Sequence, residues 1–173
     1  MNFRPFVMAL SAAFPLLMPA SAIPADSMEK AAAVEDDDGK YFDADGVPTF
    51  NIENGVVDWY TFSGYRRYHS DCHVCHGPDG VGSSYAPALV DSLKNMDYAT
   101  FLAIVAEGRT VVGGGKENVM PGFGDNKNVY CYLDDIYVYL RARAVGAAPR
   151  GRPPKKEDKP QGAKDYEASC MEG

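Results

Sequence analysis

The sequence predicts a mainly helical domain over residues 59–143, preceded by a small β-hairpin and followed by a basic tail. Three observations predict this class. Apolar residues recur at helical spacing in the last predicted helix, an Asn-Gly pair separates two short apolar runs, and a stretch rich in proline, glycine and lysine begins after residue 144. Strands and helices do not alternate along the chain, so we do not expect a parallel α/β sheet.

Residues 1–22 are predicted to be a signal peptide. Arg4 supplies the positive start, residues 6–18 are almost wholly apolar, and residues 20–22 have the small-x-small pattern of a signal-peptidase site. This apolar stretch is too short for an ordinary membrane span, although an N-terminal anchor that is never cut is the alternative interpretation. We therefore expect a protein exported to the periplasm, with no membrane span after cleavage.

The charge balance excludes one class of partner. The chain has a formal net charge of −7, and cleavage of the signal peptide removes one arginine and no acid. Phosphates would repel such a chain, so no nucleic-acid partner is expected. A net negative charge instead favours steering toward a basic patch on a protein partner.

Residues 23–58 are expected to form an acidic extension that ends in a hairpin. Eight acidic residues and two lysines lie between Asp26 and Asp45, so the start of this segment is expected to be mobile. Farther along, Asn54-Gly55 is the preferred pair for a tight hairpin turn. An Asp-x-Asp-Gly sequence at Asp43 resembles part of a calcium loop, but most ligands of such a loop are missing, and a turn is the preferred interpretation.

The helices of the domain are predicted from their end signals. They span residues 63–72, 98–107 and 128–143. Ser63 is the expected N-cap of the first, Asp97 caps the second, and Gly108 ends it. A glycine-rich loop, residues 112–124, is expected between the second and third helices. The tail, residues 144–173, is expected to begin as a solvated linker because of its proline and lysine content.

The pattern Cys72-x-x-Cys75-His76 carries the main chemical signal. Positions i, i+3 and i+4 share one face of a helical turn, so both sulfurs can reach one porphyrin edge while the histidine turns toward the iron. This is the attachment pattern of a c-type haem. A thioredoxin-like dithiol requires a βαβ surrounding, and structural zinc requires a second ligand pair at short spacing. Neither is present, so the sequence predicts one covalent haem c.

A sixth iron ligand is expected from a methionine or from a second histidine. The candidates are Met28, Met96, Met120, Met171 and His69. Met120 is preferred because Pro121-Gly122-Phe123 follows it, and the proline stiffens the loop that presents its sulfur. The carbonyl of Pro87 is a candidate acceptor for the second ring nitrogen of His76, although Pro87 is equally interpretable as an ordinary loop proline.

Two cysteines remain once the haem is attached. Cys131 and Cys170 form an even pair in an oxidising compartment, so we predict a disulfide that ties the tail to the start of the last helix. Two separate reactive thiols are the alternative.

Several of these residues resemble one family. His76, Pro87, Met120-Pro121 and the helix around residues 136–140 look like a class I cytochrome c, and the resemblance covers roughly residues 59–143. It implies that the first and last helices cross near a glycine and aromatic residues. These residues map to Gly64, Tyr68 and Tyr139.

A narrower resemblance covers residues 59–69 and 72–80. These runs look like the methanol-oxidation-associated cytochromes c, the cytochrome cL-like, XoxG-type electron acceptors, in a version with four cysteines. The resemblance implies an electron-transfer protein and not an enzyme. It also implies that the electron donor is a lanthanide-type methanol dehydrogenase that holds pyrroloquinoline quinone (PQQ). The implied electron acceptor is another cytochrome c.

Two other functions remain open from the sequence. One is a general periplasmic cytochrome c that serves another dehydrogenase or an oxidase. The other is a haem enzyme or gas sensor with a labile sixth ligand.

Overall fold

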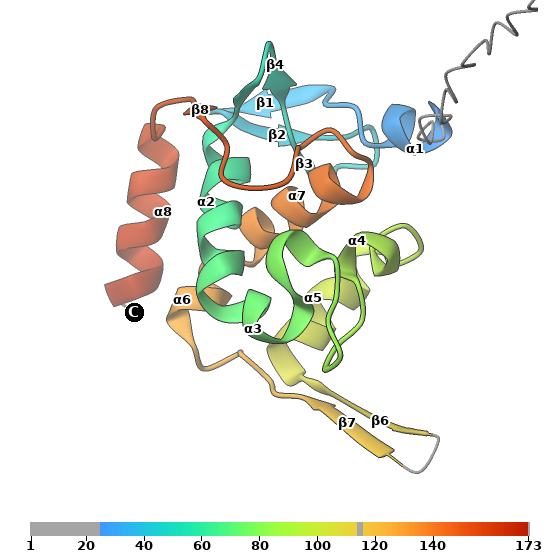
Figure 1. Ribbon diagram of the computed structural model, residues 1–173. Coiled ribbons are helices and arrows are strands. Elements are labelled where there is room, and N and C mark those ends of the chain that lie inside the picture. Colours follow the sequence, from blue (N-terminus) through green and yellow to red (C-terminus); the bar gives the residue numbers. More distant parts are fainter. Residues whose placement is uncertain (1–24, 114–115, 173) are drawn as a thin grey trace, which may run out of the picture.

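The computed structural model describes residues 25–113 and 116–172 (Figure 1). The predicted signal peptide, residues 1–22, lies outside the described residues. Within the described ranges, no helix has both the length and the apolar character needed to cross a bilayer.

The acidic N-terminal segment folds onto the body of the domain. It contains α1 (Ala25–Lys30) and a three-stranded antiparallel sheet of β1 (Glu35–Asp37), β2 (Lys40–Phe42) and β3 (Pro48–Thr49). We expected a mobile start, but long-range contacts hold the segment. The buried Thr49 hydroxyl donates to the Ala31 carbonyl at 2.6 Å, and Arg141 pairs with Asp43 at 2.6 Å. Local composition does not reveal such partners.

The Asp43 turn and the hairpin after it agree with the sequence. Asp43 Oδ1 accepts hydrogen bonds from the amides of Asp45 and Val47, both at 2.9 Å, as in a side-chain-stabilised turn. β4 (Ile52–Glu53) and β5 (Val56–Val57) are antiparallel and are joined by Asn54-Gly55, whose φ values are 51° and 77°. Both central residues have positive φ, as this tight turn requires.

Helices make up the centre of the domain. They are α2 (Trp59–Arg67), a π-helical turn η1 (Tyr68–Cys72), α3 (His73–His76), a 3₁₀ turn η2 (Pro78–Gly80), α4 (Leu89–Ser92), α5 (Tyr98–Glu107), α6 (Lys127–Tyr130) and α7 (Leu133–Ala144). α5 has the predicted bounds, with Asp97 as its N-cap and Gly108 as its end.

The first and last of the predicted helices differ from expectation in detail. α2 begins at Trp59 and not at Ser63, because Asp58 is the N-cap and accepts from the Thr61 amide at 2.8 Å and the Thr61 hydroxyl at 2.6 Å. The helix predicted over residues 128–143 is divided into α6 and α7. The division lies at Cys131 and Tyr132, where the disulfide joins the chain.

α2 and α7 cross at Gly64, as the family resemblance implied. A Cβ atom on Gly64 would lie 1.8 Å from the Asp135 carbonyl oxygen, so only glycine permits this approach of the two backbones. Tyr68 and Tyr139 are fully buried beside the crossing, with ring centroids 5.7 Å apart. Much of the apolar core surrounds this crossing and includes Phe101 from α5 and Leu140 from α7.

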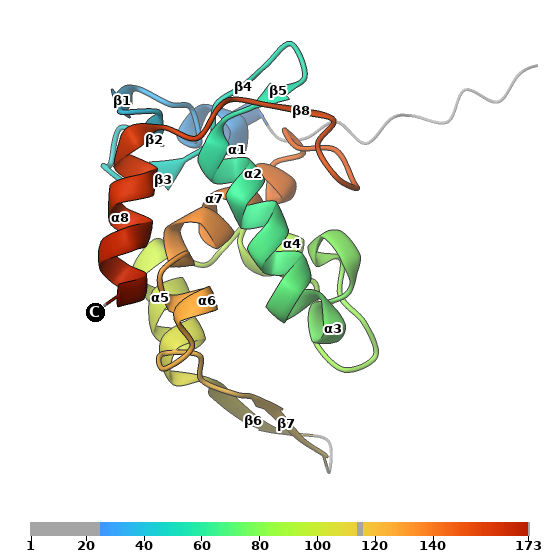
Figure 2. The same ribbon diagram turned by 90° about the vertical axis from the view of Figure 1, so that its left-hand side faces the viewer.

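The predicted glycine-rich loop is partly a hairpin. β6 (Arg109–Gly113) pairs antiparallel with β7 (Lys116–Met120), and the two strands project away from the helices (Figures 1 and 2). β-Branched residues at Thr110, Val111, Val112 and Val119 favour extended backbone, and this preference outweighs the glycines, which cluster near the turn.

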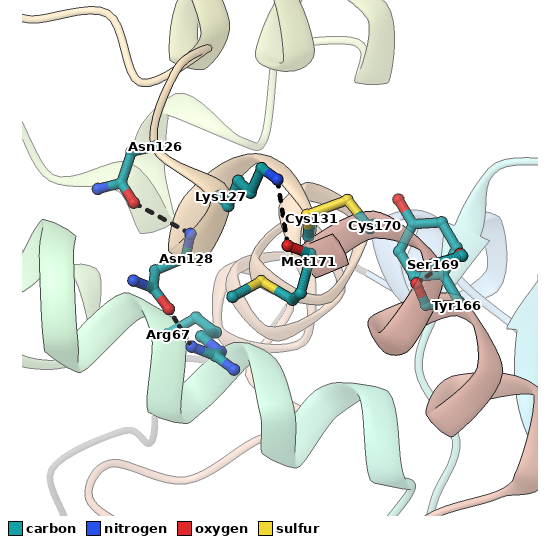
Figure 3. The surroundings of a disulfide bond; sticks show 9 residues. All are labelled: Arg67, Asn126, Lys127, Asn128, Cys131, Tyr166, Ser169, Cys170 and Met171. Atoms are coloured by element: carbon teal, nitrogen blue, oxygen red, sulfur yellow. Dashed lines mark hydrogen bonds between the residues drawn. A yellow bond between two sulfur atoms is a disulfide. The ribbon is translucent and has the colours of Figure 1, made fainter. Parts of the chain in front are cut away.

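The tail is an ordered strap and helix, not a solvated linker. It passes over the N-terminal end of α2, where β8 (Lys155–Lys156) pairs parallel with β5, and it ends in α8 (Gln161–Glu172) (Figure 1). The predicted disulfide is confirmed, because Cys131 and Cys170 are joined with an S–S distance of 1.98 Å (Figure 3). Lys127 Nζ also donates to the Met171 carbonyl at 3.1 Å, so the end of α8 is attached both to α6 and to the residue that follows it.

Candidate haem site

The two motif cysteines lie one helical turn apart. Cys72 ends η1, and Cys75 lies in α3 beside His76, so the three side chains come from adjoining turns. Both thiols are free; Cys75 is exposed and Cys72 is half-buried. Burial, reinforced by the charges of Asp71 and Cys75, raises the pKa of the Cys72 thiol to about 12. A reactive redox dithiol needs a stabilised thiolate, so burial of Cys72 disfavours that alternative.

His76 is held in one orientation. Only 7 % of it is exposed, and its Nδ1 lies 3.0 Å from the Pro87 carbonyl oxygen. A carbonyl oxygen can only accept, so Nδ1 carries the proton and donates it, as the sequence suggested. The lone pair is then on Nε2, the nitrogen free to ligate a metal. The backbone after the histidine is also fixed, because the Gly82 amide donates to the His76 carbonyl at 2.7 Å.

A buried tyrosine supports the segment that follows the motif. The Tyr68 hydroxyl donates to the Gly77 carbonyl at 2.6 Å, and Tyr68 itself has no exposed surface. Tyr68 stands on the helix leading into the motif, so the hydrogen bond closes the motif into a compact loop. Gly77 has a φ of 72°, a conformation that favours glycine at this turn.

Asp79 joins this segment to the C-terminal tail at residues 150 and 151. Its Oδ1 accepts from the Gly151 amide at 2.9 Å and from the Tyr139 hydroxyl at 3.3 Å, and its Oδ2 lies 3.3 Å from Arg150 Nε. Burial acts to raise the pKa of Asp79. The Gly151 and Arg150 hydrogen bonds outweigh that effect, so its pKa lies below the ordinary value.

Met120 is the last residue of β7, and a loop held by hydrogen bonds follows it. The Phe123 amide donates to the Val105 carbonyl at 2.9 Å, and the Gly124 amide donates to the Ala106 carbonyl at 3.0 Å. These bonds fix the loop against the C-terminal end of α5. Met120 is half-buried and packs on the same apolar cluster as Cys72, so the structure brings this methionine and the motif to one core.

The other candidate ligands are placed differently. Met28 and Met171 are exposed on α1 and α8, whereas Met96 packs on the same apolar cluster as Met120 and Cys72. Both ring nitrogens of His69 have partners: Nδ1 lies 2.8 Å from the Tyr65 carbonyl oxygen, and Nε2 accepts from the Asp79 amide at 3.4 Å. Met120 stays the predicted sixth ligand because of the proline that follows it. Among the described residues, no group of three or more His, Cys, Asp or Glu side chains is placed to hold a metal ion.

Comparison with solved structures identifies the family. The crystal structure of the c-type cytochrome XoxG from Methylobacterium extorquens AM1 matches 87% of this chain and 92% of its own, with a TM-score of 0.80 and 57% sequence identity. The chain belongs to the c-type cytochromes. Its fold is therefore the class I cytochrome c fold, with small sheets and a disulfide-tethered C-terminal region.

Two curated relatives and a family model agree. The cytochrome is 56% identical to cytochrome c-553I of Paracoccus denitrificans over 138 residues, which is 79% of this chain and 61% of that protein. It therefore spans about three fifths of that relative's length. It is 38% identical to cytochrome c-555 of Methylococcus capsulatus over 96 residues, 55% of this chain and 72% of the relative. Residues 62–140 match the family described as cytochrome C oxidase, cbb3-type, subunit III.

Membership in this family makes covalently bound haem c the cofactor and electron transfer the activity, in place of enzymatic catalysis. The residues of this cytochrome fit the cofactor. Two free thiols stand at the attachment spacing, and the adjacent histidine has Nε2 available. The sequence did not predict the contribution of Asp79 and the strap, since residues 79 and 151 meet only in the folded chain. The one local signal was the Pro-Asp-Gly turn, in which Asp79 has a φ of 58°.

Proposed function

We propose that Cys72 and Cys75 bind the haem through thioethers and that His76 Nε2 and the Met120 sulfur are its axial ligands. The haem supplies a one-electron iron couple. The chain fixes His76 through Pro87, and it fixes the Met120 loop through α5. With both residues as ligands, the iron would have no position open to a small molecule, and this would favour electron transfer.

We further propose that the cytochrome is periplasmic and takes single electrons from a PQQ-dependent methanol dehydrogenase of the lanthanide type, passing them to a downstream cytochrome c. The observation that carries this proposal is the 57% identity to XoxG over nearly the whole fold. The resemblance of residues 59–80 to methanol-oxidation cytochromes supports it. Oxidation of one alcohol releases two electrons, so two oxidised cytochromes are needed for each turnover, and each encounter must be brief.

The net charge of −7 supports an electrostatically steered encounter with a basic patch on the dehydrogenase. Steering of this kind weakens as the Debye length falls from about 30 Å at 0.01 M salt to about 3 Å at 1 M. The rate of reduction is therefore expected to decrease with salt. A rate that is constant over this range would contradict the steering.

The direct test measures reduction of the purified holoprotein by lanthanide-loaded methanol dehydrogenase with methanol, followed by haem absorbance. A calcium-type methanol dehydrogenase and an unrelated periplasmic quinoprotein dehydrogenase serve as comparisons. Preferential reduction by the lanthanide enzyme supports the proposal. Equal or faster reduction by the unrelated dehydrogenase contradicts it.

One observation favours a second candidate, a general periplasmic carrier that serves an oxidase or another dehydrogenase. Residues 62–140 match the family that is described as cytochrome C oxidase, cbb3-type, subunit III. Rapid oxidation of the reduced cytochrome by membranes containing such an oxidase, together with slow reduction by methanol dehydrogenase, would favour this candidate. Ready binding of carbon monoxide to the reduced protein would instead favour a haem enzyme or gas sensor.

A further inference from the structure

The C-terminal tail carries a run of positive charge on an acidic protein. We call residues 150–156 the basic strap. They include four cationic residues and no acidic one, whereas the whole chain has a net charge of −7. All four cationic residues are exposed: Arg150, Arg152, Lys155 and Lys156. The strap passes across the upper part of Figure 1, between α7 and α8.

The strap is held in place by its backbone. Lys155 and Lys156 are paired with Val56 and Val57 of the hairpin, and the Gly151 amide donates to Asp79 at 2.9 Å. Pro153 and Pro154 restrict the backbone between these two attachments. The charges are therefore fixed on one surface, and little chain entropy is lost when a partner binds there.

The strap also borders the segment that carries the haem motif. Asp79, its main anchor, stands three residues after His76, and Arg143 Nε additionally lies 3.4 Å from the Asp79 carbonyl oxygen. The Arg150–Gly151 end of the strap thus borders the segment that carries the haem motif, whereas Lys155 and Lys156 lie beside the hairpin at the N-terminal end of α2. Asp79 offsets the charge of Arg150, which leaves three cations without a compensating anion inside the strap.

A purely structural role explains only some of these charges. The Arg152 guanidinium lies 5.5 Å from the Phe62 ring centroid, and Lys156 Nζ lies 4.9 Å from that of Trp59. These contacts help to hold the strap on α2. Lys155, in contrast, makes no side-chain hydrogen bond or ion pair within the described part of the chain.

We propose that the basic strap is the docking surface for a redox partner whose own contact face is acidic. This inference rests on the electron-transfer role of the family and not on the identity of the donor. Fixed, exposed charges of one sign steer an oppositely charged partner and set its orientation. Such a partner is distinct from the one that the net negative charge attracts, so the cytochrome presents surfaces of opposite sign to two partners.

The test compares two charge-reversed holoproteins of equal net charge. The strap variant is Arg152→Glu with Lys155→Glu, and the control is Lys30→Glu with Lys164→Glu, which alters exposed lysines of α1 and α8. Lys155→Glu alone is a further variant that leaves the contact with Phe62 intact. Thermal unfolding confirms that each variant is folded.

The first measurement uses hexacyanoferrate(III), an anion that takes one electron from the reduced cytochrome. At low ionic strength we expect oxidation of the strap variant to be at least about threefold slower than that of the control. We expect the reverse order with a cationic cobalt(III) phenanthroline complex, and no difference at about 1 M salt, where the Debye length is about 3 Å. Equal rates for the strap variant and the control would overturn the proposal.

The second measurement follows reduction by methanol dehydrogenase and oxidation by another periplasmic cytochrome c. We expect oxidation by the other cytochrome c to slow selectively in the strap variant, with carbodiimide joining Lys155 to a carboxylate of that cytochrome, whereas reduction by the dehydrogenase is not slowed relative to the control. If the dehydrogenase does not reduce the wild-type protein, the proposed donor fails, and the hexacyanoferrate measurement still decides the role of the strap. Strap-dependent binding to phosphatidylglycerol vesicles, with no change in either protein reaction, would overturn docking of a protein in favour of a membrane.

Discussion

Substitution of Gly64 by alanine tests whether the contact between α2 and α7 organises the fold. An alanine Cβ would lie 1.8 Å from the Asp135 carbonyl oxygen and 2.8 Å from the Tyr139 Cβ. A carbon–oxygen contact normally requires about 3.3 Å or more, so the helices must separate by roughly 1.5 Å. Backbone atoms supply the closest contacts, so a change of side-chain rotamer cannot relieve them.

The cost follows from overpacking and lost contacts. Forcing extra atoms into a packed core costs about 1–3 kcal/mol and sometimes more, whereas alanine gains about 1 kcal/mol over glycine in a helix. Because this clash is with backbone, we take the upper part of the range and expect a net loss of about 2 kcal/mol or more. For a chain of this size, such a loss lowers Tm by roughly 4–8 °C.

The assay is urea and thermal unfolding of the holoprotein, followed by circular dichroism and haem absorbance. Gly162→Ala is the matched control, because its new Cβ would meet only the end of a flexible side chain, Asp38 Oδ2, at 2.8 Å. We expect the control to lose less than about 1 kcal/mol. A Gly64→Ala protein as stable as the control would refute the reasoning about this crossing.

Three further predictions concern the proposed ligand, the disulfide and a buried acid. Met120→Ala is expected to abolish the methionine–iron absorption band near the red end of the spectrum. The reduced variant should also bind carbon monoxide, which the wild-type protein should not do. An unchanged spectrum would exclude Met120 as a ligand. The double variant Cys131→Ser, Cys170→Ser is expected to have a free energy of unfolding lower by about 3–4 kcal/mol, because the disulfide spans 39 residues. Thiol counting on the unreduced wild-type protein should find no free thiol at these two positions. Burial, with a smaller contribution from Asp134, raises the pKa of Asp135 to about 7. The native state therefore binds this proton more tightly than the unfolded chain, so the contribution of Asp135 to stability is greatest below about pH 4 and is lost as pH rises through 7. Asp135→Asn should remove this loss, and denaturant titrations at pH 5 and pH 8 measure it; the same pH dependence in the variant would contradict the assignment.

Local signals predicted the parts of the fold that local interactions determine. Asn54-Gly55 gave the hairpin, Asp97 and Gly108 gave the bounds of α5, and the motif gave the placement of His76 beside Cys75. The cysteine count gave the disulfide correctly, because two thiols remained in an oxidising compartment.

Elements that depend on distant partners were predicted wrongly. The tail was interpreted as a linker because its prolines and lysines bury little surface, yet its backbone pairs with β5 and its Gly151 amide binds Asp79. The predicted start of α2 was too late in the sequence, because Ser63 and Asp58 are both acceptable N-caps. Only the fold shows that Asp58 accepts a hydrogen bond from the Thr61 amide. For the candidate site, the placement of the motif followed from sequence and Met120 stays a prediction, whereas the Asp79 contacts could not be predicted.

The connections of Asp79 have a consequence for the speed of electron exchange. One carboxylate ties the loop after His76 to α7 through Tyr139 and to the tail through Gly151. A framework that barely changes shape between the ferric and ferrous states keeps the reorganisation energy low. We expect a C-terminal segment that supplies no ligand to limit such changes of shape, because it holds the loop after His76 through Asp79.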